Sequence, residues 1–200
     1  MVRDAYKFIL PLLILGGLSA FLHIPVLTIL IVALAAFVAF FFRNPGRQIP
    51  DGKNLIVSPA DGKVVKISRH EDGEQTVCIF LNVFNVHVNR SPISGTVKRF
   101  EYKRGKFKVA FDDEASKVNE QNIVTIANGD IQIIVKQVAG LIARRVICWK
   151  KIGDMLQRGE LFGLIRFGSR VDIILPESAR IRVKVGDHVQ GGSSIIGDYL

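Results

Sequence analysis

The longest uncharged stretch of the chain, residues 8–42, constrains the fold most, because no formally charged side chain occurs between Lys7 and Arg43. A single membrane-spanning helix needs about 20 apolar residues. These 35 residues are therefore too many for one span and slightly few for two spans and a loop. His23-Ile24-Pro25 interrupts the stretch near its middle, where proline removes a helical hydrogen-bond donor. The pattern predicts a hydrophobic helical hairpin over residues 1–42, which either spans the bilayer or dips into it.

Positive residues flank both ends of this stretch: Arg3 and Lys7 before it, and Arg43 and Arg47 after it. The positive-inside rule then predicts that both ends, and the rest of the chain, lie on the cytoplasmic face of the cell membrane. A cleaved signal peptide is the competing interpretation. It is disfavoured because the apolar stretch is too long and no small-residue cleavage site precedes Arg43.

Residues 43–200 form a second region in which short β-rich runs alternate with turn signals such as Asp61-Gly62, Asp72-Gly73 and Asn128-Gly129. This spacing predicts a mainly β body, a sandwich or barrel. The segment VKVGDHVQGGSSIIG, residues 183–197, resembles barrel-sandwich domains of the lipoyl and biotinyl type. An alternative function is therefore a membrane-anchored binding or adaptor module without catalysis. A carrier module needs a lysine at an exposed hairpin tip between two small or Met residues, a setting that Lys63 lacks, and an adaptor needs a coiled-coil hairpin, for which no heptads are present.

The formal net charge of +9 indicates an acidic partner, either nucleic acid, anionic lipid or an acidic small molecule. Nucleic acid is disfavoured because no zinc-finger spacing, aromatic RNA-binding motif or long basic helix occurs. A hydrophobic N-terminus beside a basic body favours an anionic membrane surface. Cys78 and Cys148 each lie in an apolar run, which predicts reduced core thiols and neither a disulfide nor a metal site.

Gly168-Ser169 lies inside LIRFGSRVDIIL, residues 164–175, between two apolar, strand-like runs. Glycine weakens a strand and leaves nothing to pack, so a Gly-Ser pair here needs a reason. A bulge or tight turn is one reason. The other is that the Gly168–Ser169 bond is meant to be broken, with the serine hydroxyl as the nucleophile.

Three segments in order resemble the short form of the phosphatidylserine decarboxylase family: VSPADGKVV (57–65), FNVHVNRSPISGTV (84–97) and GELFGLIRFGSRVDIILP (159–176). Relatives that act on archaetidylserine are included, since the head group is the same. The chain has F-G-S-R where long-form members have L-G-S-T. It has only His87 where they have two histidines in an H-R-V-H arrangement.

The resemblance implies a self-processing enzyme that converts phosphatidylserine to phosphatidylethanolamine and CO2. Ser169 attacks the Gly168 carbonyl, and the chain is cut into a large chain (1–168) and a small chain (169–200) that stay associated. Ser169 becomes a covalent pyruvoyl group, which forms a Schiff base with the substrate, so neither pyridoxal phosphate nor a metal is needed. Ser193, in QGGSSIIG, is a second candidate, but cleavage there would leave a tail too short to hold a strand pairing.

His87 is the predicted base, because it lies in a matching motif, and Asp61 in PADG is the predicted orienting carboxylate. The alternatives are a buried core histidine and a turn aspartate. Arg144 and Arg145 are candidates to bind the lipid phosphate, although an arginine pair at a strand edge also pairs with nearby acids. The basic, aromatic stretch 98–111 is either a lipid contact or a solvated hairpin.

Overall fold

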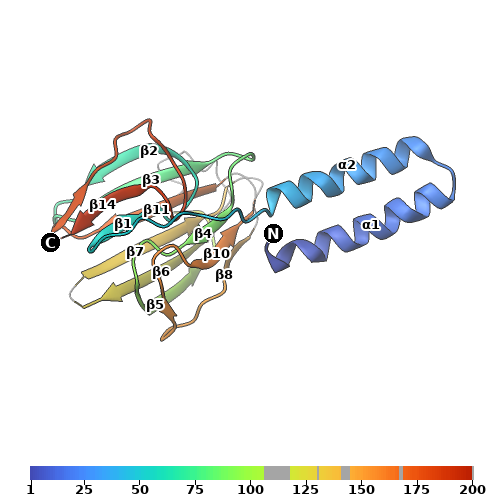
Figure 1. The fold of residues 1–200 in the computed structure, drawn as a ribbon. Helices are drawn as coiled ribbons and strands as arrows, with labels where there is room; N and C mark the ends of the chain where they lie inside the picture. Colours follow the sequence, from blue (N-terminus) through green and yellow to red (C-terminus); the bar gives the residue numbers. More distant parts are fainter. Residues whose placement is uncertain (106–117, 130, 141–144, 167–168, 200) are drawn as a thin grey trace. The chain divides into compact units, whose positions relative to one another are not determined.

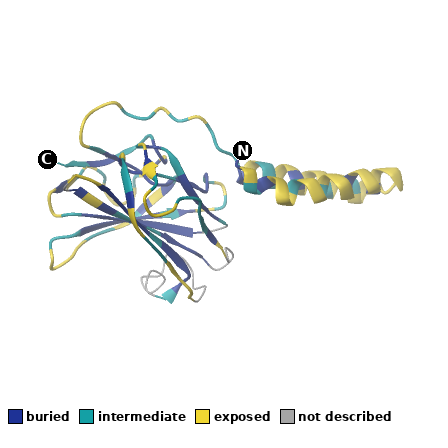
Figure 2. Cartoon of the chain, turned by 90° about the horizontal axis from the view of Figure 1, so that it is seen from below, coloured by how far each residue is buried: buried dark blue, intermediate teal, exposed yellow. Residues whose placement is uncertain are grey.

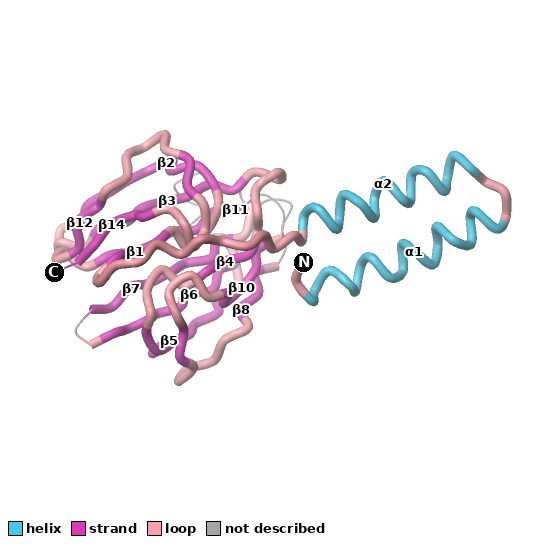
Figure 3. The backbone as a smooth tube through the Cα atoms, viewed as in Figure 1, coloured by secondary structure: helices cyan, strands magenta, loops and turns pink. Residues whose placement is uncertain are grey.

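The computed structural model describes residues 1–105, 118–129, 131–140, 145–166 and 169–199. The chain divides into two compact units, Met1–Gly46 and Arg47–Leu200, and each is described by itself. Helices make up the first unit and strands the second (Figure 3). The predicted mainly β body preceded by a helical hairpin is therefore confirmed.

The first unit is a hairpin of two helices, α1 (Tyr6–Phe21) and α2 (Pro25–Phe41), which follow a short 3-10 helix (Arg3–Ala5). The turn between α1 and α2 falls at the predicted break, where His23 has a φ of 56° and Pro25 occupies the first turn of α2. A hydrogen bond between the hydroxyls of Ser19 and Thr28, 2.9 Å long, joins the two helices near this turn. Proline suits a first helical turn because the amide N–H there has no partner within the helix.

Most large apolar side chains of the hairpin are exposed (Figure 2). The helical stretch Arg3–Phe21, 19 residues long, is long and apolar enough to cross a membrane by length and composition. The second helix, α2, is apolar but shorter. A surface of this kind is stable in hydrocarbon and unfavourable in water, since exposed apolar area costs about 25 cal/mol per Å².

The second unit is built from antiparallel strands (Figure 1). The strands are β1 (Leu55–Val57), β2 (Gly62–Arg69), β3 (Gln75–Leu81), β4 (Val88–Arg90), β5 (Gly95–Lys103), β6 (Gln121–Asn128), β7 (Ile131–Val138), β8 (Val146–Cys148), β9 (Met155–Leu156), β10 (Leu161–Ile165), β11 (Ser169–Leu175), β12 (Ala179–Ile181), β13 (His188–Val189) and β14 (Ile195–Tyr199).

Among the described residues, these strands form one eight-stranded sheet and two three-stranded sheets. The eight-stranded sheet has the order β13-β2-β3-β11-β7-β6-β5-β9 and curls into a half-barrel. The small sheets have the orders β1-β14-β12 and β4-β10-β8. The chain leaves the second of these small sheets at Ile165 and enters the large sheet at Ser169. Ser169 is therefore the first residue of the large sheet after the chain has crossed from one sheet to another.

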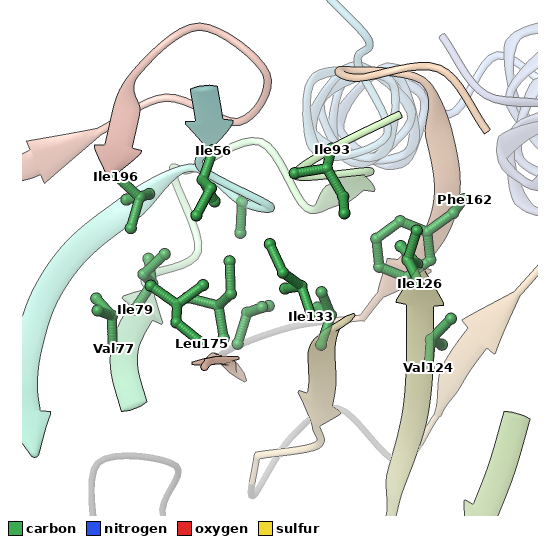
Figure 4. Close-up of a cluster of buried hydrophobic side chains, with 14 of the residues drawn as sticks. Ile56, Val77, Ile79, Ile93, Val124, Ile126, Ile133, Phe162, Leu175 and Ile196 are labelled. Carbon is green, nitrogen blue, oxygen red and sulfur yellow. The ribbon is translucent and has the colours of Figure 1, made fainter. Parts of the chain in front are cut away.

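One hydrophobic core fills the curl of the large sheet, and side chains such as Ile79, Ile133 and Leu175 converge there (Figure 4). Alternation along β11 explains how this strand contributes to it. Val171 and Leu175 belong to the core cluster, whereas Arg170 and Asp172 lie at the alternate positions and form an ion pair with N···O 2.8 Å. By the same alternation, Ser169 faces the core side of the sheet.

The apolar run VFNVHV, residues 83–88, alternates as a strand would, but only Val88 belongs to a strand. Side chains compete with the sheet for the backbone there. The Phe84 amide donates to Oδ1 of Asn82, and the Asn82 amide donates to Oδ1 of Asn85, each over 2.9 Å. These bonds hold a turn between β3 and β4, because short amide side chains offer the backbone partners that a ladder would otherwise supply.

Candidate active site

Ser169 is the first residue of β11, and its backbone pairs in register with Leu81 of β3. The side chain is fully buried, and its Oγ has no hydrogen-bond partner in the part of the chain that the structure describes. A buried hydroxyl without a partner costs about 1–3 kcal/mol. Gly168 lies outside the described residues. By contrast Ser193, the second candidate, is half-buried in a turn where its amide donates to the Gln190 carbonyl.

His87 lies immediately before β4 and is fully buried. Its carbonyl accepts a 3.1 Å hydrogen bond from the amide of Ile165, the last residue of β10. His87 is therefore beside the strand that leads into Ser169. Its Nδ1 is 3.0 Å from the carbonyl oxygen of Asn85, and because a carbonyl only accepts, Nδ1 carries the proton of the neutral ring. The other nitrogen, Nε2, is then the basic one.

Asp61 precedes β2 and holds two segments of the body together. Nη2 of Arg47 donates to both carboxylate oxygens over 2.8 and 2.7 Å, and the Gly191 amide donates to Oδ1 over 2.8 Å. Arg47 also donates to Gln190 through Nη1. Within the described chain, the Asp61 carboxylate is bonded to these groups and not to His87. The role of Asp61 in orienting His87 therefore stays a prediction.

The arginine pair is placed only in part, because Arg144 lies outside the described residues. Arg145 is exposed, and its carbonyl accepts a 3.3 Å bond from the Arg166 amide. Strand β8, which follows Arg145, pairs with β10. The structure thus brings the Arg145 backbone to the segment that approaches Ser169. Binding of a phosphate by either arginine stays a prediction.

Sequence reasoning missed a buried chain of carboxamides formed by Asn89, Gln137 and Asn122. Gln137 donates through Nε2 to Oδ1 of Asn89 over 2.7 Å, and its Oε1 accepts from Nδ2 of Asn122 over 2.9 Å. A signal was present in β7. Ile131, Ile133 and Val135 face the core at alternate positions, so the next position in that series placed a polar side chain inside.

Both cysteines are free, as predicted. Burial, followed by the neighbouring Asp172 charge, raises the pKa of the Cys78 thiol to about 12. Burial also raises the pKa of Cys148. Within the described residues, no three or more His, Cys, Asp or Glu side chains are grouped so that they could hold a metal ion.

Comparison with known proteins decides the family. The sequence profile described as phosphatidylserine decarboxylase matches residues 34–197. A phosphatidylserine decarboxylase proenzyme of Solibacter usitatus is 48% identical over 200 residues, covering 100% of this chain and 97% of that protein. A protein of the same name from Syntrophus aciditrophicus is 44% identical over 202 residues, covering 95% of each chain. The chain belongs to the phosphatidylserine decarboxylase family.

This membership confirms the predicted class of enzyme, a decarboxylase, over a binding module without catalysis. It also confirms the resemblance drawn from the three segments, since the matched range contains all of them. The buried Ser169 hydroxyl, which has no hydrogen-bond partner among the described residues, is free of competing bonds and would suit a residue that has to react.

Proposed function

We propose that the chain is a self-processing decarboxylase that converts phosphatidylserine to phosphatidylethanolamine and CO2, using a pyruvoyl group made from Ser169. One observation carries the proposal. The Ser169 hydroxyl is buried at the first residue of β11 with no partner in the described part of the chain, and the relatives of this chain are named proenzymes. A residue with only a structural role in a turn would satisfy its hydroxyl or expose it to water.

The proposed processing begins when Oγ of Ser169 attacks the Gly168 carbonyl carbon and His87 accepts the hydroxyl proton. The C–N bond then breaks, the Ser169 nitrogen takes up the proton, and an ester joins the two chains. Removal of the Cα proton of Ser169 breaks the Cβ–O bond, leaving a carboxylate on Gly168 and a dehydroalanine at position 169. Water converts this to the pyruvoyl group and ammonia. The buried, Nδ1-protonated ring of His87 supports its role as the base.

The pyruvoyl group, once formed, supplies an electron-accepting carbonyl to which the substrate amine is joined while CO2 leaves, so no pyridoxal phosphate or metal is required. The chain's own residues hold that position. Strand β11 is central in the sheet, flanked by β3 and β7 over most of its length. The first residue of the small chain would therefore stay at a fixed place after cleavage.

Strand pairing supports the proposal that the two product chains remain associated. Residues 169–200 contribute β11 to the large sheet, while β13 pairs with β2 and β14 pairs with β1. The hydrogen bonds from Arg47 to Gln190 and from the Gly191 amide to Asp61 also join residues on opposite sides of the cut. Asp61 thus has a second role, which is to tie the small chain to the large one.

The helical hairpin supports a lipid substrate at a membrane. Its apolar surface and the positive residues at both of its ends favour an anionic membrane, with the body on the cytoplasmic face. Within the body, the turn that separates Leu81 from His87 carries Phe84, whose side chain is 68% exposed. Because Leu81 is the register partner of Ser169, this apolar tip lies at the same end of the sheet as the reacting residue.

The decisive experiment is the intact mass of the purified chain and of Ser169→Ala. The wild type is expected to give two chains, residues 1–168 and a shorter one that begins at position 169, and Ser169→Ala a single uncut chain without decarboxylase activity. Ser193→Ala is the matched control and should cut normally. Two chains in Ser169→Ala, or one chain in active wild type, would overturn the assignment.

A second prediction concerns His87 and Asp61. If they act as a unit, His87→Ala gives a folded, uncut chain, Asp61→Asn slows cutting severely, and the double variant is little worse than His87→Ala. Cutting rates are measured in freshly synthesised protein. Additive losses would show that Asp61 acts separately, through its bonds to Arg47 and Gly191. Normal cutting in His87→Ala would remove His87 from the mechanism.

A further inference from the structure

The orientation of the Asn89 side chain follows from the carboxamide network. Nε2 of Gln137 lies 3.3 Å from the carbonyl oxygen of Ile147 and 2.7 Å from Asn89. A backbone carbonyl only accepts hydrogen bonds, so the Gln137 atom that meets it is the NH2 group. The Asn89 atom that receives the other hydrogen bond is then Oδ1. The remaining end of the Asn89 amide is therefore an NH2 donor.

This donor lies in the interior of the body. Asn89 is fully buried, and its Nδ2 meets no hydrogen-bond partner among the residues the structure describes. Leaving a buried N–H group unpaired costs about 1–3 kcal/mol, and folded proteins contain few such groups. A cost of this size in a network that is otherwise satisfied points to a group whose partner appears only during a reaction.

The fold places this donor near the reacting serine. Gln137 is the register partner of Val171, which lies two residues after Ser169 on the same inward face. Diagonal neighbours on adjacent strands are about 7–8 Å apart, so Gln137 and Ser169 are close. Asn89, held by Gln137, lies two residues after His87, and both side chains are fully buried. The donor, the base and the nucleophile therefore share one region of the interior.

Gly163 leaves room for the carboxamide network between Gln137 and Asn89. It is the register partner of Asn89 on β10. A Cβ atom at position 163 would lie 2.6 Å from Nε2 of Gln137 and would also collide with the Ile147 carbonyl. Only glycine leaves room for the Gln137 amide to pass over β10 and hold Asn89. Glycine at position 163 therefore leaves the space that the Gln137 amide needs to hold the Asn89 donor.

We infer that Nδ2 of Asn89 donates a hydrogen bond to the oxygen that gains negative charge when Ser169 attacks the preceding carbonyl carbon. The inference rests on the proposed function. In that step the Oγ–C bond forms, the hydroxyl proton passes to His87, and the C=O electron pair moves onto oxygen. Re-formation of C=O then breaks the C–N bond, and the Ser169 nitrogen takes the proton. A fixed donor at such an oxygen accelerates a reaction about 10²–10³-fold.

The test compares two ends of the same network in the full-length proenzyme. Asn89→Ala removes the donor, and Asn89→Asp keeps an oxygen for Gln137 while replacing the donor by an acceptor. Both are expected to slow self-cutting about 10²-fold or more, with an unchanged circular dichroism spectrum and a thermal midpoint within a few degrees. Asn122→Ala is the matched control. It removes the amide at the far end and should cut within about tenfold of wild type.

Hydroxylamine, which cleaves esters, identifies the step. If Asn89 acts in ester formation, hydroxylamine does not restore cutting in its variants. Restoration would show that the ester forms normally and would overturn the inference. Normal cutting in folded Asn89→Asp would also overturn the inference. An equal slowing in Asn122→Ala would overturn it too, because the network would then have a structural role only. If the wild type never cuts at Ser169, both the proposed function and this inference are wrong. If the wild type cuts at Ser169 and only the predictions for the Asn89 variants are wrong, the proposed function still stands.

Discussion

The hairpin and the body use the same apolar residues in opposite ways. In the hairpin Ile14 is 71% exposed and Phe21 is 78% exposed, whereas in the body Ile79 and Ile133 are fully buried. The difference follows from the pattern of neighbours. Apolar residues cover every side of α1 and α2, but alternate with polar ones along strands such as β2. An apolar helix pair has no interior of its own in which to bury these side chains, so its surface favours a lipid environment, whereas the body forms its own interior.

Removal of residues 1–46 is the strongest test of whether the body is independent of the hairpin. The remaining body is expected to fold and to cut itself, because its core and all three family segments lie after residue 54. It should lose membrane association and lose about tenfold or more of its turnover on vesicles, since a tether raises the effective substrate concentration. Activity on a soluble short-chain substrate serves as the control. A folded but uncut body would show that the hairpin belongs to the catalytic unit.

A matched pair of isoleucine substitutions compares what an apolar side chain contributes to stability in each unit. Ile133→Ala empties space in the core and should destabilise the body by about 2–5 kcal/mol in the full chain in detergent. Ile29→Ala, at a position that is 67% exposed on α2, should change the body's unfolding free energy by less than about 0.5 kcal/mol. Denaturant titration measures both. Equal losses would mean that the hairpin side chain supports the body's core.

The smallest predicted effect concerns how well the folded body shields its two cysteines from a thiol reagent. The pKa of about 12 leaves Cys78 almost entirely protonated, and at pH 9 only about one molecule in a thousand would carry the reactive thiolate. Iodoacetamide should therefore modify half-buried Cys148 first and Cys78 only after unfolding in urea. Peptide mass mapping distinguishes the two thiols. Equal labelling rates in the folded protein would show that the sheet opens at β3.

The sequence alone determined the parts of this protein that depend on local pattern. The uncharged stretch with His23-Ile24-Pro25 predicted two helices and the turn between them, and alternating β runs predicted most strands. The three family segments identified the enzyme class and pointed to Ser169 and His87. These features are local because helix breaks, strand alternation and motifs are set by residues close together in the chain. Apolar alternation does not indicate the turn at Asn82–Asn85, because two side chains bind the backbone there in place of a neighbouring strand.

Only the tertiary structure decided which distant residues meet. Gln137 and Asn89 are 48 positions apart, and Asp61 and Gly191 are 130 apart, so no local pattern joins them. The fold alone sealed the hydroxyl of Ser169 and the amide of Asn89, because burial depends on how the sheet curls and what packs against it. It also gave Asp61 the partners Arg47 and Gly191, where the motif had predicted His87. Side-chain hydrogen bonds are short-ranged, and only a packed interior brings their donors and acceptors within reach.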